Sequence, residues 1–202
     1  DTLDNYICNE QQQYLKLFNL KLTDRFLDVG ANIGATAFFV ADKVSKVFCY
    51  EPDVDNFELL QKNTKSLKNI YRFNYALVGN TDTTRDFYIN TKTNKATHSF
   101  LVERGRDKTV VKCRNVNYTI KLHKINVIKM DIEGAEYELL INMNYSSVSK
   151  IDELVFEYHF TILKYDKYLE LIKLLKKKFA SVKYKLDPKK CWTTLVYCSN
   201  RR

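Results

Sequence analysis

The sequence predicts an α/β protein with a mostly parallel sheet and helices on both faces. Short apolar, β-rich segments alternate with longer amphipathic segments along the 202 residues. A glycine turn over 30–34 joins the first strand to a helix, and the next strand ends at an acidic residue, Glu51. This strand, turn, helix and strand form a βαβ unit of the kind that binds nucleosides, with the acid placed for ribose hydroxyls.

The expected elements follow in a regular order. A helix over 9–20, within an N-terminal cap of residues 1–24, should cover one end of the sheet. Seven strands are expected, at 25–29, 46–51, 70–76, 126–130, 153–158, 180–186 and 192–198. Helices are expected at 34–44, at 55–67, from 134 onward and at 162–179. Asp55 and Glu58 have the spacing of a capped helix start. The two closing strands form a hairpin, so the last strand should run antiparallel.

Residues 77–124 interrupt this alternation. β-like segments at 85–89, 109–113 and 117–121 flank a polar stretch over 90–96. We interpret 77–124 as an inserted hairpin and loop region near the rim of the site. The whole chain, 1–202, is interpreted as one domain.

Composition limits the class of protein. Hydrophobic residues make up 45% and charged residues 28% of the chain, which indicates a globular protein. The net charge of +9 would suit an anionic partner, but the lysines of 173–178 share a helix with an apolar stripe and fit a solvated helix face. No apolar stretch is long enough to span a membrane.

The cysteines and the N-terminus indicate where the protein acts. Five cysteines without a Cys-x-x-Cys pair argue against a zinc site or a disulfide framework, and so for a reducing, cytoplasmic location. The chain starts at Asp1 without an initiator Met, a basic start or an apolar run. We therefore expect no signal peptide, and either a processed chain or one domain of a larger protein.

The turn after the first strand selects a cofactor. A dinucleotide fingerprint needs three glycines, whereas only Gly30 and Gly34 are present and Asn32 takes the middle position. Asp28 lies two residues before the first glycine. This suits a ligand without a pyrophosphate but with an amino group and a carboxylate, such as S-adenosylmethionine. The alternative is a plain turn that packs a helix on a strand.

Acidic residues and a histidine follow two later strands. The block from Lys129 to Glu136 ends one strand, and Glu157 to His159 ends the next. Ligands bind outside the carboxyl ends of strands in open α/β sheets. We therefore expect Asp131, Glu133, Glu157 and His159 to line one crevice with Asp28, Asn32 and Glu51.

Methyl transfer from a sulfonium requires alignment, exclusion of water and removal of a proton from the acceptor. His159 is a natural base, because its pKa lies near working pH. Asp131 could instead be the base or orient His159. A third possibility is a cation, Mg²⁺ or Mn²⁺, held by Asp131, Glu157 and His159. The sequence leaves these three roles open.

Five motifs together resemble the FkbM-type methyltransferases. They are Asp28 to Gly34, Tyr50 to Pro52, Asn74 to Leu77, Lys129 to Glu136, and Glu157 to His159. The resemblance implies a Rossmann-like class I S-adenosylmethionine-dependent fold with a seven-stranded sheet. It also implies O-methylation of a hydroxyl, commonly on a sugar or a polyketide-type product.

The resemblance assigns roles to residues by motif. Those expected to hold the methionine part of the cofactor are Asp28, Gly30, Ala31, Asn32 and Gly34. Glu51 would bind the ribose, and Pro52, Asp53 and Ala76 would border the adenine. Asp131, which also borders the cofactor, would face the acceptor with Glu133, Glu157 and His159. The region 77–124 would select the acceptor.

Three functions remain open. The first is methylation of a sugar hydroxyl, on a glycan or a nucleotide sugar, by one domain of a larger glycan-building protein. Richness in Lys, Asn and Tyr suggests a viral protein, which would act in the host cytoplasm. The second is ribose 2′-O-methylation of RNA, for which Asp131 and Glu157 fit a Lys-Asp-Lys-Glu arrangement but no lysine is placed, Lys129 included. The third is a non-catalytic cofactor-binding domain.

Overall fold

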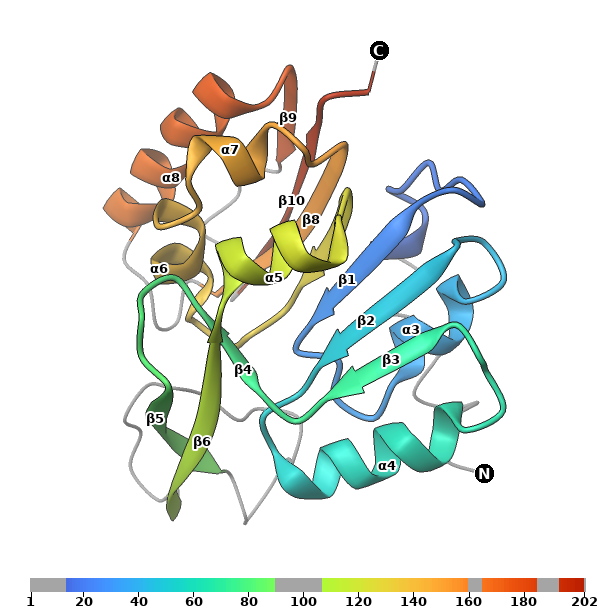
Figure 1. Cartoon of the computed structure of the whole chain (residues 1–202). Coiled ribbons are helices and arrows are strands. Elements are labelled where there is room, and N and C mark those ends of the chain that lie inside the picture. Colours follow the sequence, from blue (N-terminus) through green and yellow to red (C-terminus); the bar gives the residue numbers. More distant parts are fainter. Residues whose placement is uncertain (1–13, 90–106, 160–164, 185–192, 202) are drawn as a thin grey trace.

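The main sheet has seven strands in the order β3-β2-β1-β7-β8-β10-β9 (Figure 1). The computed structural model describes residues 14–89, 107–159, 165–184 and 193–201. The strands are β1 (Arg25–Val29), β2 (Lys46–Tyr50), β3 (Ile70–Phe73), β7 (Val127–Met130), β8 (Glu153–His159), β9 (Ser181–Tyr184) and β10 (Thr193–Ser199). The neighbouring strands β3, β2, β1, β7 and β8 run parallel, and β10 is antiparallel to both of its neighbours. The predicted sheet is confirmed.

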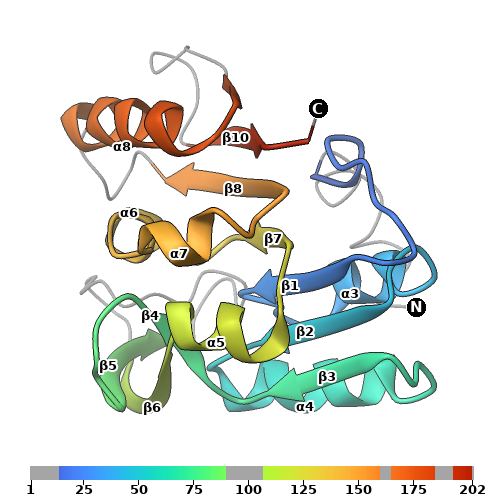
Figure 2. The same ribbon diagram turned by 45° about the horizontal axis from the view of Figure 1, so that its top comes forward.

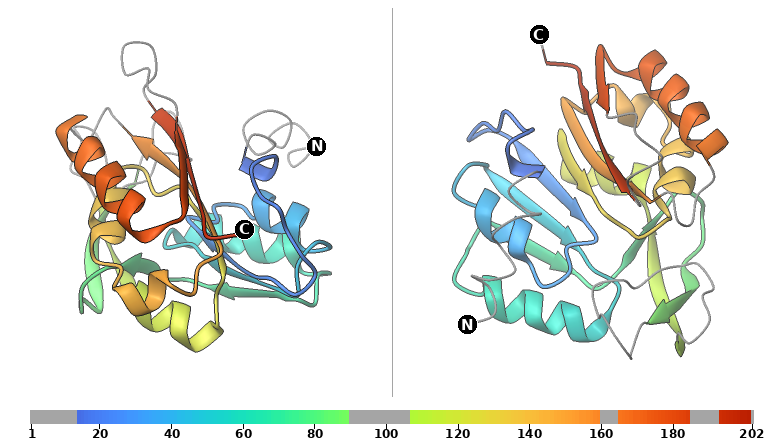
Figure 3. Two further views of the ribbon diagram at one scale, coloured as in Figure 1. Left: turned by 90° about the horizontal axis from the view of Figure 1, so that it is seen from above. Right: turned by 180° about the vertical axis from the view of Figure 1, so that it is seen from behind.

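Helices cover both faces of this sheet, as Figures 2 and 3 show. On one face, α3 (Ala35–Val40) and α4 (Val54–Thr64) lie behind β1 to β3. On the other face lie α5 (Val116–His123), α6 (Glu136–Ile141), α7 (Tyr145–Val148) and α8 (Tyr165–Lys178). Each face has its own apolar core, one around Phe26 and Leu60 and the other around Phe156 and Leu171. This arrangement follows from strand residues that alternate between the two faces.

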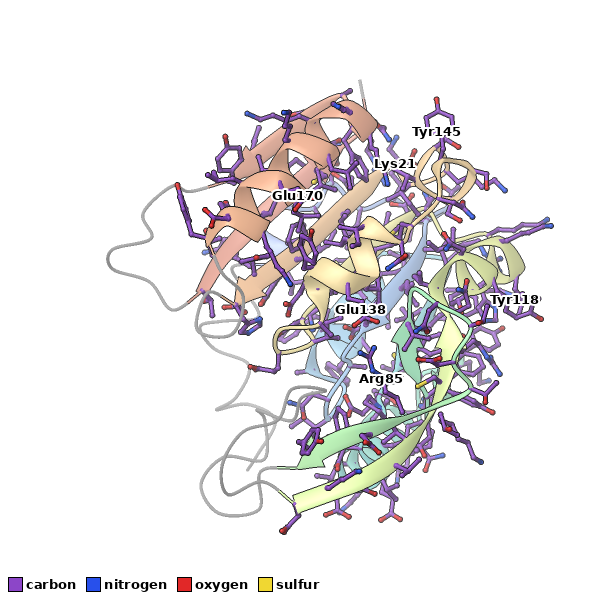
Figure 4. The ribbon with its side chains drawn as sticks, turned by 90° about the vertical axis from the view of Figure 1, so that its left-hand side faces the viewer. Lys21, Arg85, Tyr118, Glu138, Tyr145 and Glu170 are labelled. Carbon is purple, nitrogen blue, oxygen red and sulfur yellow. The ribbon has the colours of Figure 1, made fainter. Side chains whose placement is uncertain are left out.

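The inserted region forms a small second sheet in the order β4-β6-β5. Its strands are β4 (Ala76–Val78), β5 (Thr84–Ile89) and β6 (Asp107–Asn115). β5 pairs antiparallel with β6, with Arg85 opposite Val111. Figure 4 shows Arg85 of β5 directed toward Glu138 of α6, and the two form a bidentate ion pair at 2.7 and 2.8 Å. This pair ties the insert to the main sheet's helices.

Three expectations about single elements are wrong. Residues 117–121 were expected as a strand but lie in α5, because Asn115 caps a helix through the backbone N–H of Tyr118. The strand expected over 70–76 is divided, since β3 ends at Phe73 and β4 begins at Ala76. The helix expected over 9–20 is seen only at Tyr14 and Leu15, and a turn and a segment without regular structure follow; residues 9–13 lie outside the described part.

Two properties of the described residues bear on the expectations from composition. Cys49, Cys113 and Cys198 are free thiols and buried. Among the helices of the described segments, none combines the length and the apolar character that a bilayer crossing requires.

Candidate active site

The turn between β1 and α3 brings three strands together. Gly30 has φ +72°, and its backbone N–H donates to Tyr50 O at 3.0 Å. A Cβ at Gly30 would lie 1.9 Å from the carbonyl oxygen of Asp131, and one at Gly34 would lie 2.7 Å from Leu60 Cδ1. Both glycines are therefore required by close packing against the protein itself. In particular, Gly30 lets the turn touch the end of β7.

Glu51 connects this turn to the end of β2. Its side chain is 5% exposed, with Oε2 accepting from Asn32 N–H at 2.7 Å and Oε1 from Asp53 N–H at 2.9 Å. Burial raises the pKa of Glu51 to about 7, although the two N–H donors oppose this. Each carboxylate oxygen keeps a second lone pair, so ribose binding by Glu51 stays a prediction.

The residues expected around the adenine have structural partners of their own. Asp53 is the N-cap of α4, and its Oδ1 accepts from Asn56 N–H at 2.8 Å. Asn74 Nδ2 donates to Pro52 O at 3.0 Å and so fixes the loop after β2. Ala76 is buried at the start of β4. Their contact with an adenine remains a prediction.

Asp28 and Lys129 form a buried charged pair on adjacent strands. They are partners in the register of β1 and β7, and their side chains are 0% and 3% exposed. Lys129 Nζ lies 3.4 Å from Asp28 Oδ1 and donates to Gly30 O at 3.1 Å. Burial raises the pKa of Asp28, and Lys129 opposes this shift. Lys129 is thus the partner of Oδ1, whereas Asp28 Oδ2 has no hydrogen-bond donor within the described ranges.

The sequence alone did not place Lys129 in the site, but the structure brings it beside Asp28. Burial lowers the pKa of Lys129, but the charges of Asp28 and Asp131 outweigh it and raise that pKa.

The loop after β7 is built around Glu136, the first residue of α6. Glu133 and Gly134 both have positive φ, +49° and +100°, which turns the chain back on itself. Glu136 is 0% exposed, and its Oε1 accepts from Gly134 N–H at 3.1 Å and from Ile132 N–H at 3.3 Å. The same oxygen lies 2.8 Å from His159 Nδ1. Glu136 thus orients both this loop and the histidine at the end of β8.

His159 faces two further carboxylates. It is 5% exposed, and its Nε2 lies 3.4 Å from Glu133 Oε2 and 3.8 Å from Asp131 Oδ1. Burial lowers the pKa of His159, but the Glu136 hydrogen bond and the neighbouring carboxylates outweigh it and raise the pKa to about 10. Burial also raises the pKa of Glu133 to about 7, although His159 opposes this. At neutral pH the histidine is therefore an imidazolium among acids.

Glu157 lies two residues before His159 on β8 and has a different partner. Tyr14 from the N-terminal segment donates its hydroxyl to Glu157 Oε2, and the same hydroxyl lies 3.5 Å from Asp131 Oδ2. The group expected to hold a cation was Asp131, Glu157 and His159. Within the described part of the chain, Glu133 is found in place of Glu157, since ligand atoms of Asp131, Glu133 and His159 all lie within 4.8 Å of one another.

Sequence reasoning brought Asp28, Asp131, Glu133, Glu157 and His159 to the correct strand ends. It missed Lys129, Tyr14 and the orienting role of Glu136. Lys129 could have been found from its spacing to Asp131. Tyr14 had no signal, because its contacts lie more than a hundred residues away along the chain.

Comparison with known proteins defines the family. A family model described as the methyltransferase FkbM domain matches residues 28–185, most of the chain. The chain belongs to the FkbM methyltransferase family. A curated relative, the hexuronic acid methyltransferase AglP of Haloferax volcanii, is 26% identical over 137 residues. That alignment covers 67% of this chain and 56% of the relative, so the chain spans little more than half of the relative's length.

Solved structures share the fold of this FkbM domain. A methyltransferase FkbM from Methylobacillus flagellatus superposes with a TM-score of 0.58 at 18% identity, covering 90% of this chain and 45% of that one. A Streptococcus mutans protein described as a methyltransferase, in complex with SAH (S-adenosylhomocysteine), superposes with a TM-score of 0.57 at 10% identity, covering 89% of this chain and 90% of that one. At these identities the likeness establishes the Rossmann-like methyltransferase fold.

Proposed function

We propose that this chain transfers a methyl group from S-adenosylmethionine to a hydroxyl of a sugar. Membership of the FkbM family supports methyl transfer. The description of AglP as a hexuronic acid methyltransferase supports a sugar acceptor, and the SAH in the Streptococcus mutans structure supports the cofactor.

The observation that carries the proposal is the buried carboxylate of Asp28 beside the acids at the end of β7. Lys129 Nζ lies 3.4 Å from its Oδ1, and its Oδ2 lacks a hydrogen-bond donor in the described structure although the residue is 0% exposed. A buried carboxylate oxygen without a donor is costly, and the amino group of the cofactor would supply one. The cofactor carries an ammonium and a sulfonium, so a site containing Asp28, Asp131 and Glu133 fits its charge.

The chain's own residues divide the remaining work. When bound, S-adenosylmethionine supplies a methyl group already activated by the positive charge on sulfur. Asp28 would bind the amino group, and Glu51 would bind ribose hydroxyls. Glu133 would accept the proton of the sugar hydroxyl, because its pKa of about 7 suits a base at neutral pH and its side chain is 24% exposed.

His159 is assigned an electrostatic role in this mechanism. A protonated imidazole has no free lone pair, and a pKa of about 10 keeps His159 protonated at neutral pH. It therefore cannot remove a proton there, but it can hold Asp131 and Glu133 in place. A divalent cation on Asp131, Glu133 and His159 would replace that proton, and the Glu136 bond to Nδ1 at 2.8 Å suits either form. We favour the imidazolium because the pKa of about 10 keeps Nε2 protonated at neutral pH.

The insert is proposed to select the acceptor. Its strand β5 is tied to α6 by the Arg85–Glu138 pair, and α6 begins with Glu136 of the site. A change in β5 can therefore shift α6, and with it Glu136, through this ion pair.

A labelled-methyl assay tests the proposal. The protein is incubated with methyl-labelled cofactor and a panel that pairs neutral sugars with their uronic acids and adds nucleotide sugars, oligosaccharides and short RNAs. We expect label in a sugar and none after Glu133→Gln, whereas Glu170→Gln, an exposed acid of α8, should behave as wild type. Calorimetry should show SAH binding to both variants. Failure of wild-type protein to bind SAH would overturn the proposal.

The same panel decides between the alternatives. Label in RNA, with an affinity for RNA that falls steeply as salt rises, would favour ribose 2′-O-methylation of RNA. SAH binding without label in any acceptor would favour a non-catalytic cofactor-binding domain.

A further inference from the structure

Tyr14 reaches the centre of the candidate site although it lies outside residues 28–185, which the family model matches. Its side chain is 3% exposed. Its hydroxyl donates to Glu157 Oε2 and lies 3.5 Å from Asp131 Oδ2. Lys129 Nζ lies 5.7 Å from the centre of its ring. One side chain thus contacts residues from both β7 and β8.

The segment that carries Tyr14 is anchored along its length. Phe18 packs edge-on against Phe26 of β1 with ring centres 5.4 Å apart. Asn19 N–H donates to both oxygens of Glu153 on β8, at 3.2 and 3.1 Å. Arg201 near the C-terminal end donates to Asn19 O and to Asp24 Oδ2, the latter at 2.6 Å. These contacts hold the segment against β1 and β8, so Tyr14 has little freedom to leave.

The position of Tyr14 has two physical consequences. Glu157 and Asp131 are like charges on adjacent strands, and a hydroxyl between them supplies a donor that favours one arrangement of both side chains. The ring lies over Lys129 and helps keep the Asp28–Lys129 pair almost completely buried. Exclusion of water strengthens electrostatic interactions inside a site.

We propose that Tyr14 is a positioning residue of the methyl-transfer site, which acts on Glu157 and Asp131 through its hydroxyl and covers Lys129 with its ring. This inference rests on the proposed function. Membership of the FkbM family does not imply this role, because Tyr14 precedes residues 28–185, which the family model matches.

A double-mutant cycle tests the hydroxyl. Tyr14→Phe keeps the ring and removes the hydroxyl, so kcat should fall roughly 10-fold while SAH affinity stays within about 2-fold. If Tyr14 acts through Glu157, the Tyr14→Phe/Glu157→Gln double variant should be no slower than Glu157→Gln alone. The matched control is Tyr145→Phe, an exposed tyrosine on α7 that Figure 4 labels, which should match wild type. Urea unfolding of each variant checks that it is folded.

Tyr14→Ala tests the ring by a measurement that needs no acceptor. It should expose the Asp28–Lys129 pair and weaken SAH binding roughly 10-fold in calorimetry. Wild-type kcat in Tyr14→Phe would overturn the role of the hydroxyl, and independent losses in the double variant would overturn its action through Glu157. Unchanged SAH affinity in folded Tyr14→Ala would overturn the role of the ring. A wild-type protein that binds SAH but methylates nothing would count against the acceptor assignment, and the Tyr14→Ala result would still decide the inference.

Discussion

Replacing Glu136 by Gln removes the charge on which the protonation of His159 depends, while keeping the size of the side chain. Burial lowers the pKa of His159, but the Glu136 bond and the nearby carboxylates raise it from its ordinary 6.5 to about 10. One pKa unit corresponds to about 1.4 kcal/mol, which puts the linked stabilisation at ~5 kcal/mol as an upper limit. Breaking a buried ion pair costs about 3–5 kcal/mol. We therefore expect Glu136→Gln to lower the free energy of unfolding by roughly 3 kcal/mol at pH 7.

The loss should depend on pH in one direction. A group whose pKa is raised on folding contributes stability that is complete below its unfolded pKa and disappears as pH passes its folded pKa. For His159 these values are 6.5 and about 10. The difference between wild type and Glu136→Gln should thus be largest near pH 6 and shrink toward pH 10. Urea unfolding over this range measures the difference, and NMR of the imidazole should show wild-type His159 still protonated at pH 8.

Glu138→Gln is the matched control on the same helix. Glu138 forms a bidentate pair with Arg85 at 2.7 and 2.8 Å, but its side chain is 39% exposed. A partly exposed pair contributes at most about 1 kcal/mol, and its effect should not change between these pH values. A wild-type His159 that titrates near its ordinary pKa, or a Glu136→Gln loss that is constant with pH, would refute the reasoning.

Four further outcomes are expected. Asp131→Asn should lower kcat roughly 10²-fold, with SAH affinity by calorimetry nearly unchanged, because Asp131 helps to hold the His159 imidazolium beside Glu133. Because burial raises the pKa of Glu133 to about 7, kcat/KM should rise with pH up to about 7 and then level off. Any activity left in Glu133→Gln should not show this rise. Gly30→Ala should lose about 3 kcal/mol in urea unfolding, since its Cβ would lie 1.9 Å from Asp131 O at a φ of +72°. Turnover in EDTA should equal turnover in buffer, because the His159 imidazolium already lies between the carboxylates; activity that EDTA removes and Mn²⁺ restores would contradict this.

The fold could be predicted because its signals are local. Apolar strands, the turn at Gly30 and amphipathic helices each depend on neighbouring residues, and they gave the seven-stranded sheet with its antiparallel last strand. The failure at 117–121 is also local. β-branched and aromatic residues there suggested a strand, but the Asn115 cap and the burial of Val116 and Ile120, four residues apart, correspond to one turn of a helix.

The site could be predicted only in part, because side-chain pairing depends on contacts between distant segments. Acids at strand ends were predicted from the rule that ligands bind there. The bond from Glu136 to His159 required the loop at Glu133 and Gly134 to turn through two left-handed residues, which is decided by packing. The contact from Tyr14 to Glu157 depends on where the N-terminal segment is anchored, and no local pattern encodes that.

The order of the strands explains why these particular residues meet. The strands β3, β4, β5 and β6 lie between β2 and β7 in the chain, but β7 pairs with β1, and β8 pairs with β7. This order sets Asp28 beside Lys129. Met130 of β7 pairs with Phe156 of β8, so Asp131 and Glu157, which directly follow this pair, lie close together. A chain with a net charge of +9 thereby concentrates acids at one edge of its sheet. Because clustered acids attract cations, the local charge fits a cationic methyl donor better than the net charge fits an RNA acceptor.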